Sequence, residues 1–99
     1  MTLIRTLPRI DGSVLREYKN KAGDITYTLR SEIAGRGIAL KVMNCDAKGN
    51  PKIIRDVAKG RNDVYIKAED GSTILKQGDK TTTFPNLVFN KVCEILFKQ

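Results

Sequence analysis

The sequence predicts an α+β fold, an antiparallel β-meander of about five to six strands packed against one C-terminal α-helix. Turn-forming Gly, Asn and Asp residues recur at short intervals from residue 11 to residue 79. Between these turns, β-branched and aromatic residues alternate with polar ones, which is the period of a half-buried strand. Beyond residue 80 the apolar residues recur every three or four positions, which is the period of a helix. Strands followed by a single helix favour the α+β class.

The first predicted hairpin joins Val14–Lys19 to a strand that starts at Ile25. The segment 20–23 between them, Asn-Lys-Ala-Gly, has the composition of a turn. One face of the second strand carries apolar side chains, namely Ile25, Tyr27 and Leu29. Thr26, Thr28 and Arg30 form its other face, which we expect to be exposed together with Lys41 and Lys67.

The next two segments differ in how clearly they predict strands. In the third strand Ile38, Leu40 and Val42 alternate with Ala39, Lys41 and Met43, which favours a central position in the sheet. Residues 52–57 follow Pro51, which is tolerated at a strand start because proline lacks an amide donor. A helix remains an alternative for residues 52–57, since Ile53, Ile54 and Val57 would also share one helical side.

The hairpin with the clearest signal lies between residues 64 and 76. Val64, Ile66 and Ala68 alternate with Tyr65, Lys67 and Glu69. Asp70-Gly71 then supplies a tight turn with two positive φ angles, and Ser72–Lys76 returns antiparallel.

The C-terminal helix is predicted from Phe84, Leu87, Val88, Val92, Ile95 and Leu96. Thr82 and Thr83 would cap it and Pro85 would lie in its first turn. We expect this helix, with Leu96 buried, to be the largest contributor to the core. Phe89, Cys93 and Phe97 widen its apolar arc, so either the helix packs deeply or one flank meets a second chain. This arc and the unpaired sheet edges also predict a homodimer.

Composition excludes several classes of function. The 99 residues suit a single domain, residues 1–99, and they include no His, which removes Ser-His-Asp, Cys-His and His-zinc chemistry. Cys45 and Cys93 have no second pair to complete a zinc site, so we expect free thiols, no metal and no cofactor. No apolar run is long enough to span a membrane, and none resembles a secretory signal. We therefore expect a non-enzymatic, cytoplasmic protein.

The positive charge is concentrated in one part of the chain. Seven basic and two acidic residues lie between positions 36 and 61, and this segment holds +5 of the net charge of +7. The residues predicted to bind nucleic acid, here called the basic segment, are Arg36, Lys41, Lys52, Arg55, Lys59 and Arg61. They would contact the phosphate backbone, with Tyr18, Tyr27 and Tyr65 as rings for stacking or for core packing. Replacing Arg55 and Arg61 would then weaken binding without loss of stability.

Two other interpretations stay open at this stage. The chain would alternatively be a small adaptor or inhibitor that docks the basic segment on an acidic protein surface. A metal-dependent nuclease site at Asp11, Glu17 and Lys19 is a weaker interpretation than cross-strand ion pairing. Gly35-Arg36-Gly37 predicts a hinge between strands rather than a phosphate loop, and residues 69–72 predict a turn rather than a cation site.

Overall fold

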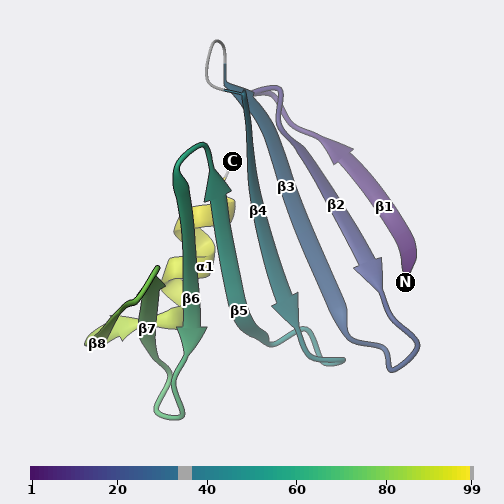
Figure 1. Cartoon of the computed structure of the whole chain (residues 1–99). Helices are drawn as coiled ribbons and strands as arrows, with labels where there is room; N and C mark the ends of the chain where they lie inside the picture. Colours follow the sequence, from purple (N-terminus) through teal and green to yellow (C-terminus); the bar gives the residue numbers. More distant parts are fainter. Residues whose placement is uncertain (34–36, 99) are drawn as a thin grey trace.

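A computed structural model describes residues 1–33 and 37–98, which form one antiparallel sheet and one helix (Figure 1). The strands are β1 (Thr2–Pro8), β2 (Val14–Lys19), β3 (Ile25–Ile33), β4 (Gly37–Cys45), β5 (Pro51–Ala58), β6 (Arg61–Lys67), β7 (Ser72–Gln77) and β8 (Lys80–Val88), followed by α1 (Phe89–Phe97). All eight strands pair with their neighbours in chain order. The predicted α+β meander with a C-terminal helix is confirmed.

The sheet has eight strands rather than five to six, because both edge strands escaped the sequence analysis. In β1 every residue is exposed, so the strand lacks the apolar alternation that marks a half-buried one. In β8 the three- and four-residue spacing of Phe84, Leu87 and Val88 is that of a helix, so the sequence predicted a helix there. Thr73 pairs with Phe84 but Ser72 pairs with Val88, so residues 85–87 bulge out of the ladder.

The helix consequently starts later than predicted. Val88 is the residue before its first turn and makes no side-chain capping hydrogen bond. The expected caps at Thr82 and Thr83 and the place of Pro85 in the first turn are therefore wrong, because all three belong to β8. The amide of Phe89 instead donates to the carbonyl of Gly71, at 2.9 Å.

The middle of the sheet agrees with the sequence analysis. Residues 51–58 form a strand that pairs with both β4 and β6, which settles the helix alternative. The third predicted strand, β4, is the fourth of eight and thus central. The turn between β6 and β7 is the exception, since the predicted two positive φ angles at Asp70-Gly71 are wrong. Only Gly71 has a positive φ, of 86°, because the turn is a longer one in which the amide of Ala68 donates to the carbonyl of Ser72.

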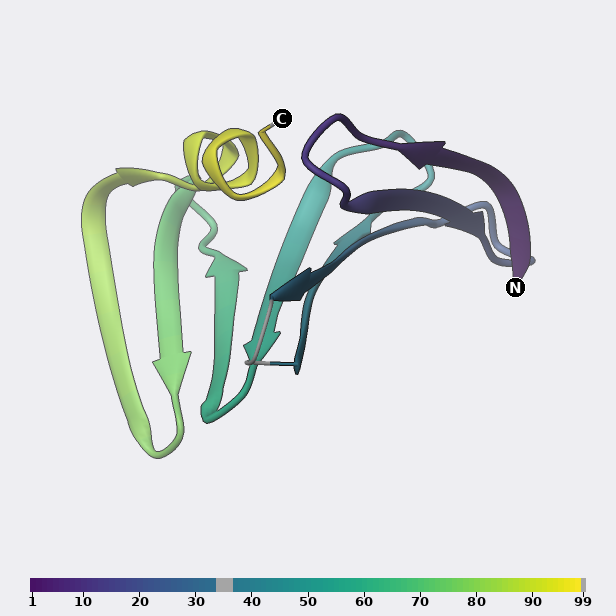
Figure 2. The same cartoon turned by 90° about the horizontal axis from the view of Figure 1, so that it is seen from above.

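The helix lies against one face of the sheet (Figure 2) and contacts β4, β5 and β6. Ile54 and Phe89 are both 0% exposed and form the core with Cys93. Around them pack the partly buried Met43, Tyr65, Leu96 and Phe97. Leu96, which the sequence predicted to be buried, is only half-buried. The helix residue buried most deeply in the core is Phe89. The described residues contain no helix long and apolar enough to cross a membrane.

The β1–β2 turn reaches the other end of the helix. The Arg9 guanidinium donates to the carbonyl of Phe97 at 2.7 Å and to that of Lys98 at 3.4 Å. These carbonyls have no partner within the helix, so Arg9 supplies the missing donors and its charge meets the negative end of the helix dipole.

Strand register divides the side chains between two faces, the helix face that contacts α1 and the open face opposite to it. Tyr27 pairs with Met43, which packs on the helix, so Ile25, Tyr27 and Leu29 lie on the helix face. Thr26, Thr28 and Arg30 lie on the open face, as expected. Lys41 and Lys67 do not, because Lys41 pairs with Leu29 and Lys67 with Thr73 on the helix face.

Candidate functional site

The structure spreads the predicted basic segment over several surfaces. Lys41 and Arg61 lie on the helix face, while Arg55 lies exposed on the open face. Lys52 is exposed beside a bulge and lies 3.8 Å from the Asp46 carboxylate, and Lys59 lies in the β5–β6 turn. Arg36 lies outside the described residues. The predicted site residues therefore do not share one surface.

Arg61 forms part of a buried charge cluster. Its guanidinium lies 3.0 Å from Asp56 and 3.7 Å from Asp63, and the Asp56 and Asp63 residues are 3% and 8% exposed. Gln77 donates to the same Asp63 carboxylate at 3.4 Å. Carboxylates this buried need a cation and hydrogen-bond donors, so Arg61 has a structural role. Its side chain is still 51% exposed, and the predicted phosphate contact stays a prediction.

The open face collects a different set of cations, from four strands. They are Arg16 on β2, Arg30 on β3, Arg55 on β5 and Lys76 on β7. Cross-strand pairing places Arg16, Thr28, Val42, Arg55, Val64 and Lys76 in one row across the sheet. Among the described residues none of these four cations has a carboxylate within ion-pair distance. Sequence analysis missed the set because its members are scattered from residue 16 to residue 76.

Aliphatic side chains cover the middle of the same face, here called the aliphatic field. They are Ile38, Leu40, Val42, Ile53, Val57, Val64, Ile66 and Ile74. Ile38 is 49% and Val57 37% exposed, and the other six are half-buried by their neighbours in the sheet. The only helix of the described chain lies on the opposite face, so no described element covers this field (Figure 2).

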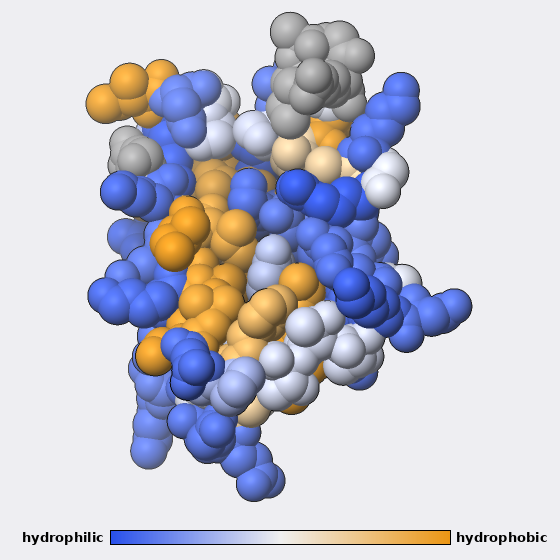
Figure 3. Space-filling model, turned by 90° about the vertical axis from the view of Figure 1, so that its left-hand side faces the viewer, coloured by the Kyte–Doolittle hydropathy of each residue, from blue (hydrophilic) through white to orange (hydrophobic). Residues whose placement is uncertain are grey.

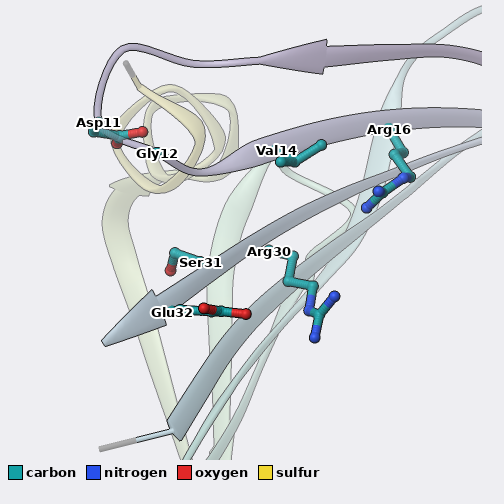
Figure 4. A pocket seen from close by; sticks show the side chains of 7 residues that line it. All are labelled: Asp11, Gly12, Val14, Arg16, Arg30, Ser31 and Glu32. Carbon is teal, nitrogen blue, oxygen red and sulfur yellow. The ribbon is translucent and has the colours of Figure 1, made fainter. Parts of the chain in front are cut away.

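A small pocket opens beside the aliphatic field, near the β1–β2 turn (Figure 4). Its volume is about 180 Å³. Val14, Arg16, Arg30 and Glu32 line it from β2 and β3, and Asp11 and Gly12 line it from the turn. Asp11 Oδ1 accepts hydrogen bonds from the Ser13 hydroxyl at 2.6 Å and the Ser13 amide at 2.9 Å. These bonds hold the pKa of Asp11 below its usual value, and the bond from the Ser13 hydroxyl has the largest effect.

The tyrosines are divided between the faces. Tyr27 and Tyr65 lie half-buried on the helix face, where burial raises the pKa of both phenols. Tyr65 packs against the core, and Tyr27 lies half-buried on the same face, so neither ring is an exposed platform. Tyr18, which pairs with Thr26, is the one tyrosine on the open face.

The weaker candidate sites have structural roles. Glu17 accepts a hydrogen bond from Arg5 Nε at 2.8 Å, which is the cross-strand ion pair expected there. The described residues contain no cluster of three His, Cys, Asp or Glu side chains suited to a metal ion. Cys45 and Cys93 are buried free thiols, and burial raises the pKa of Cys93 to about 11, so its reactive thiolate is scarce at neutral pH. The Gly35-Arg36-Gly37 hinge falls mainly outside the described residues.

A second apolar surface runs along the β8 side of the molecule (Figure 3). Phe84 and Val88 on β8 are 37% and 54% exposed, and Ile95 on the outer flank of α1 is 68% exposed. The helix is thus deeply packed only along Phe89, Val92 and Cys93.

No protein-family model, curated protein or solved structure matches this chain. The fold alone does not specify an activity, so the function depends on the surfaces of the molecule.

Proposed function

We propose that this chain is a small non-enzymatic adaptor or inhibitor whose open sheet face docks on an acidic protein surface. One observation carries the proposal: an uncovered aliphatic field lies among four cations that have no carboxylate partner in the described chain. The partner would present aliphatic side chains to the field and carboxylates to the cations.

Covering the free face with a complementary partner would be energetically favourable. Aliphatic area left in water is unfavourable by roughly 25 cal/mol per Å², so a partner that covers the field gains affinity from its burial. Unpaired guanidinium groups lose little solvation free energy when they bind carboxylates, because bidentate hydrogen bonds replace their bonds to water. Opposite charges also accelerate encounter and exclude basic partners.

The same face is less suited to a nucleic acid. Platforms for single-stranded nucleic acid combine cations with several aromatic rings on which successive bases stack. This face has the cations but offers one tyrosine amid Val, Ile and Leu side chains. Binding of a phosphate backbone by Arg16, Arg30, Arg55 and Lys76 stays a prediction. The cytoplasmic location expected from the sequence and the predicted homodimer also stay predictions.

The test begins with affinity capture on the immobilised chain, followed by calorimetry with the purified partner. Val57→Asp places a carboxylate in the aliphatic field, and Ile95→Asp is the matched control on α1. We expect Val57→Asp to weaken binding at least about tenfold and Ile95→Asp to leave it within about twofold. Arg55→Gln should weaken it about two- to tenfold, more at low salt than at high salt.

Oligonucleotides provide the competing outcome. If single-stranded or duplex DNA or RNA binds with a steep salt dependence, and Arg55→Gln reduces that dependence, the chain is a nucleic-acid-binding module instead. A purified partner that binds both aspartate variants equally well would show that docking uses another surface.

A further inference from the structure

We infer that the pocket beside the β1–β2 turn, between Arg16 and Arg30, is an oxyanion subsite that receives one carboxylate side chain of the docked partner. The inference rests on the proposed docking of the open face, since it assigns one position within that surface. It adds a defined anchor point at the corner of the face where β2 and β3 meet the turn.

The backbone brings the two arginines together. Arg16 pairs with Thr28 and Arg30 with Val14, so the two residues occupy diagonal positions on neighbouring strands of one face. Diagonal side chains across an antiparallel pair are close enough for long side chains to reach a common group. Figure 4 shows both guanidinium groups extending from the same side of β2 and β3.

The pocket has the size of a single functional group. About 180 Å³ accommodates a carboxylate with its methylene stem, but not a nucleotide or a folded element. Val14 contributes apolar surface between the charged groups, on which the stem would pack. Neither guanidinium is engaged by a carboxylate elsewhere in the described chain, so both can donate to the incoming oxygen atoms.

Two carboxylates of the lining modulate the subsite. Asp11 already accepts two hydrogen bonds from Ser13, which satisfy one of its oxygens. Glu32 makes no ion pair within the described part of the chain and lies on the pocket side away from Arg16 (Figure 4). Its charge opposes an anion, so Glu32 limits affinity for any oxyanion that is not also held by the surrounding interface.

The test uses sodium acetate as the carboxylate probe on the intact chain, at constant ionic strength. The arginine Nε–Hε signals are followed by NMR in wild type, Arg30→Gln, Glu32→Gln and Arg5→Gln. Arg5 already pairs with Glu17 at 2.8 Å on the helix face, so its variant is the matched control. We expect saturable shifts at Arg16 and Arg30 with a dissociation constant on the order of 10 mM.

The variants should move this constant in opposite directions. Arg30→Gln should weaken acetate binding at least about fivefold, Glu32→Gln should tighten it roughly three- to tenfold, and Arg5→Gln should leave it unchanged. Shifts at Arg5 and Arg55 equal to those at Arg16 and Arg30 would overturn the subsite. So would non-saturating shifts at Arg16 and Arg30, or no effect of Glu32→Gln. Inorganic phosphate forms the second arm, and saturation by phosphate without saturation by acetate would overturn its assignment to a carboxylate.

The subsite and the docking proposal fail separately. Saturable acetate binding, together with partner affinity that Val57→Asp does not change, would support the oxyanion pocket and contradict the docking face. Partner affinity that Val57→Asp weakens but Arg30→Gln does not change would support the docking face and contradict the subsite.

Discussion

The core prediction concerns Phe89, the first residue of α1. Phe89→Ala removes a fully buried ring that packs on Ile54 and Cys93, both on the seam between helix and sheet. Large-to-small changes of this kind cost about 3–5 kcal/mol, because the lost burial is compounded by the cavity that remains. Alanine has a higher helix propensity than phenylalanine, so the loss would come from packing and not from the helix itself.

The expected loss is large against the whole stability of the domain. A chain of this length has a free energy of unfolding of about 5–15 kcal/mol. With a urea m-value of about 1–3 kcal/mol/M, the loss lowers the unfolding midpoint by about 2 M. The assay is urea unfolding followed by far-UV circular dichroism.

Phe84→Ala is the matched control, since it makes the same chemical change on β8 at a side chain that is 37% exposed. Because part of this ring already contacts water, the control should cost about 1 kcal/mol and move the midpoint by about 0.5 M. Equal midpoint shifts for the two variants would refute the assignment of the core to the Phe89 seam.

Four further predictions concern charge and assembly. Burial raises the pKa of Cys93 from 9.0 to about 11, so stability should fall by up to about 2–3 kcal/mol as pH rises through this interval, measured by urea unfolding, and Cys93→Ala should flatten the fall. Arg61→Gln should cost about 1–3 kcal/mol in the same assay, because it leaves the buried Asp56 unpaired, whereas Arg55→Gln should cost under about 0.5 kcal/mol. Arg9→Gln should accelerate amide exchange in the last turn of α1 by about fivefold. For the predicted homodimer, light scattering should give twice the 11.1 kDa chain mass, and the single-chain mass at every concentration would contradict it.

The Arg61 prediction corrects an expectation from the sequence. Taken from its local sequence, Arg61 is an exposed cation in a basic stretch, and its loss should not affect stability. The structure places two nearly buried carboxylates beside it, one on its own strand and one on β5. Such a role depends on cross-strand pairing, which the local charge pattern does not contain.

The local order of the meander could be predicted because each hairpin is encoded by neighbouring residues. Gly12 and Gly71 adopt positive φ angles of 87° and 86° at turns that the sequence marks with Asp-Gly. Period-2 alternation then identified the inner strands. The edge strand β1 gave no such signal, because exposed residues on both faces remove the alternation on which the prediction depends.

The division of side chains between the two faces could not be predicted strand by strand. Alternation shows which residues of one strand share a face, but the register with the next strand decides which face it is. Lys41 follows this rule, since pairing with Leu29 places it on the helix face. Bulges between Asn44 and Cys45 and within β8 shift the alternation again, and their positions cannot be predicted from a single sequence.

The most direct test of the docking face is cross-saturation NMR on the methyl-labelled chain bound to its purified partner. Saturation of the partner should attenuate the methyl signals of Leu40, Val42, Val57 and Ile66 on the open face. The methyl signals of Val88 and Ile95 on the β8 side should keep their intensity. Attenuation confined to Val88 and Ile95, with Val57 and Ile66 unaffected, would contradict the account and place the interface on the other apolar surface.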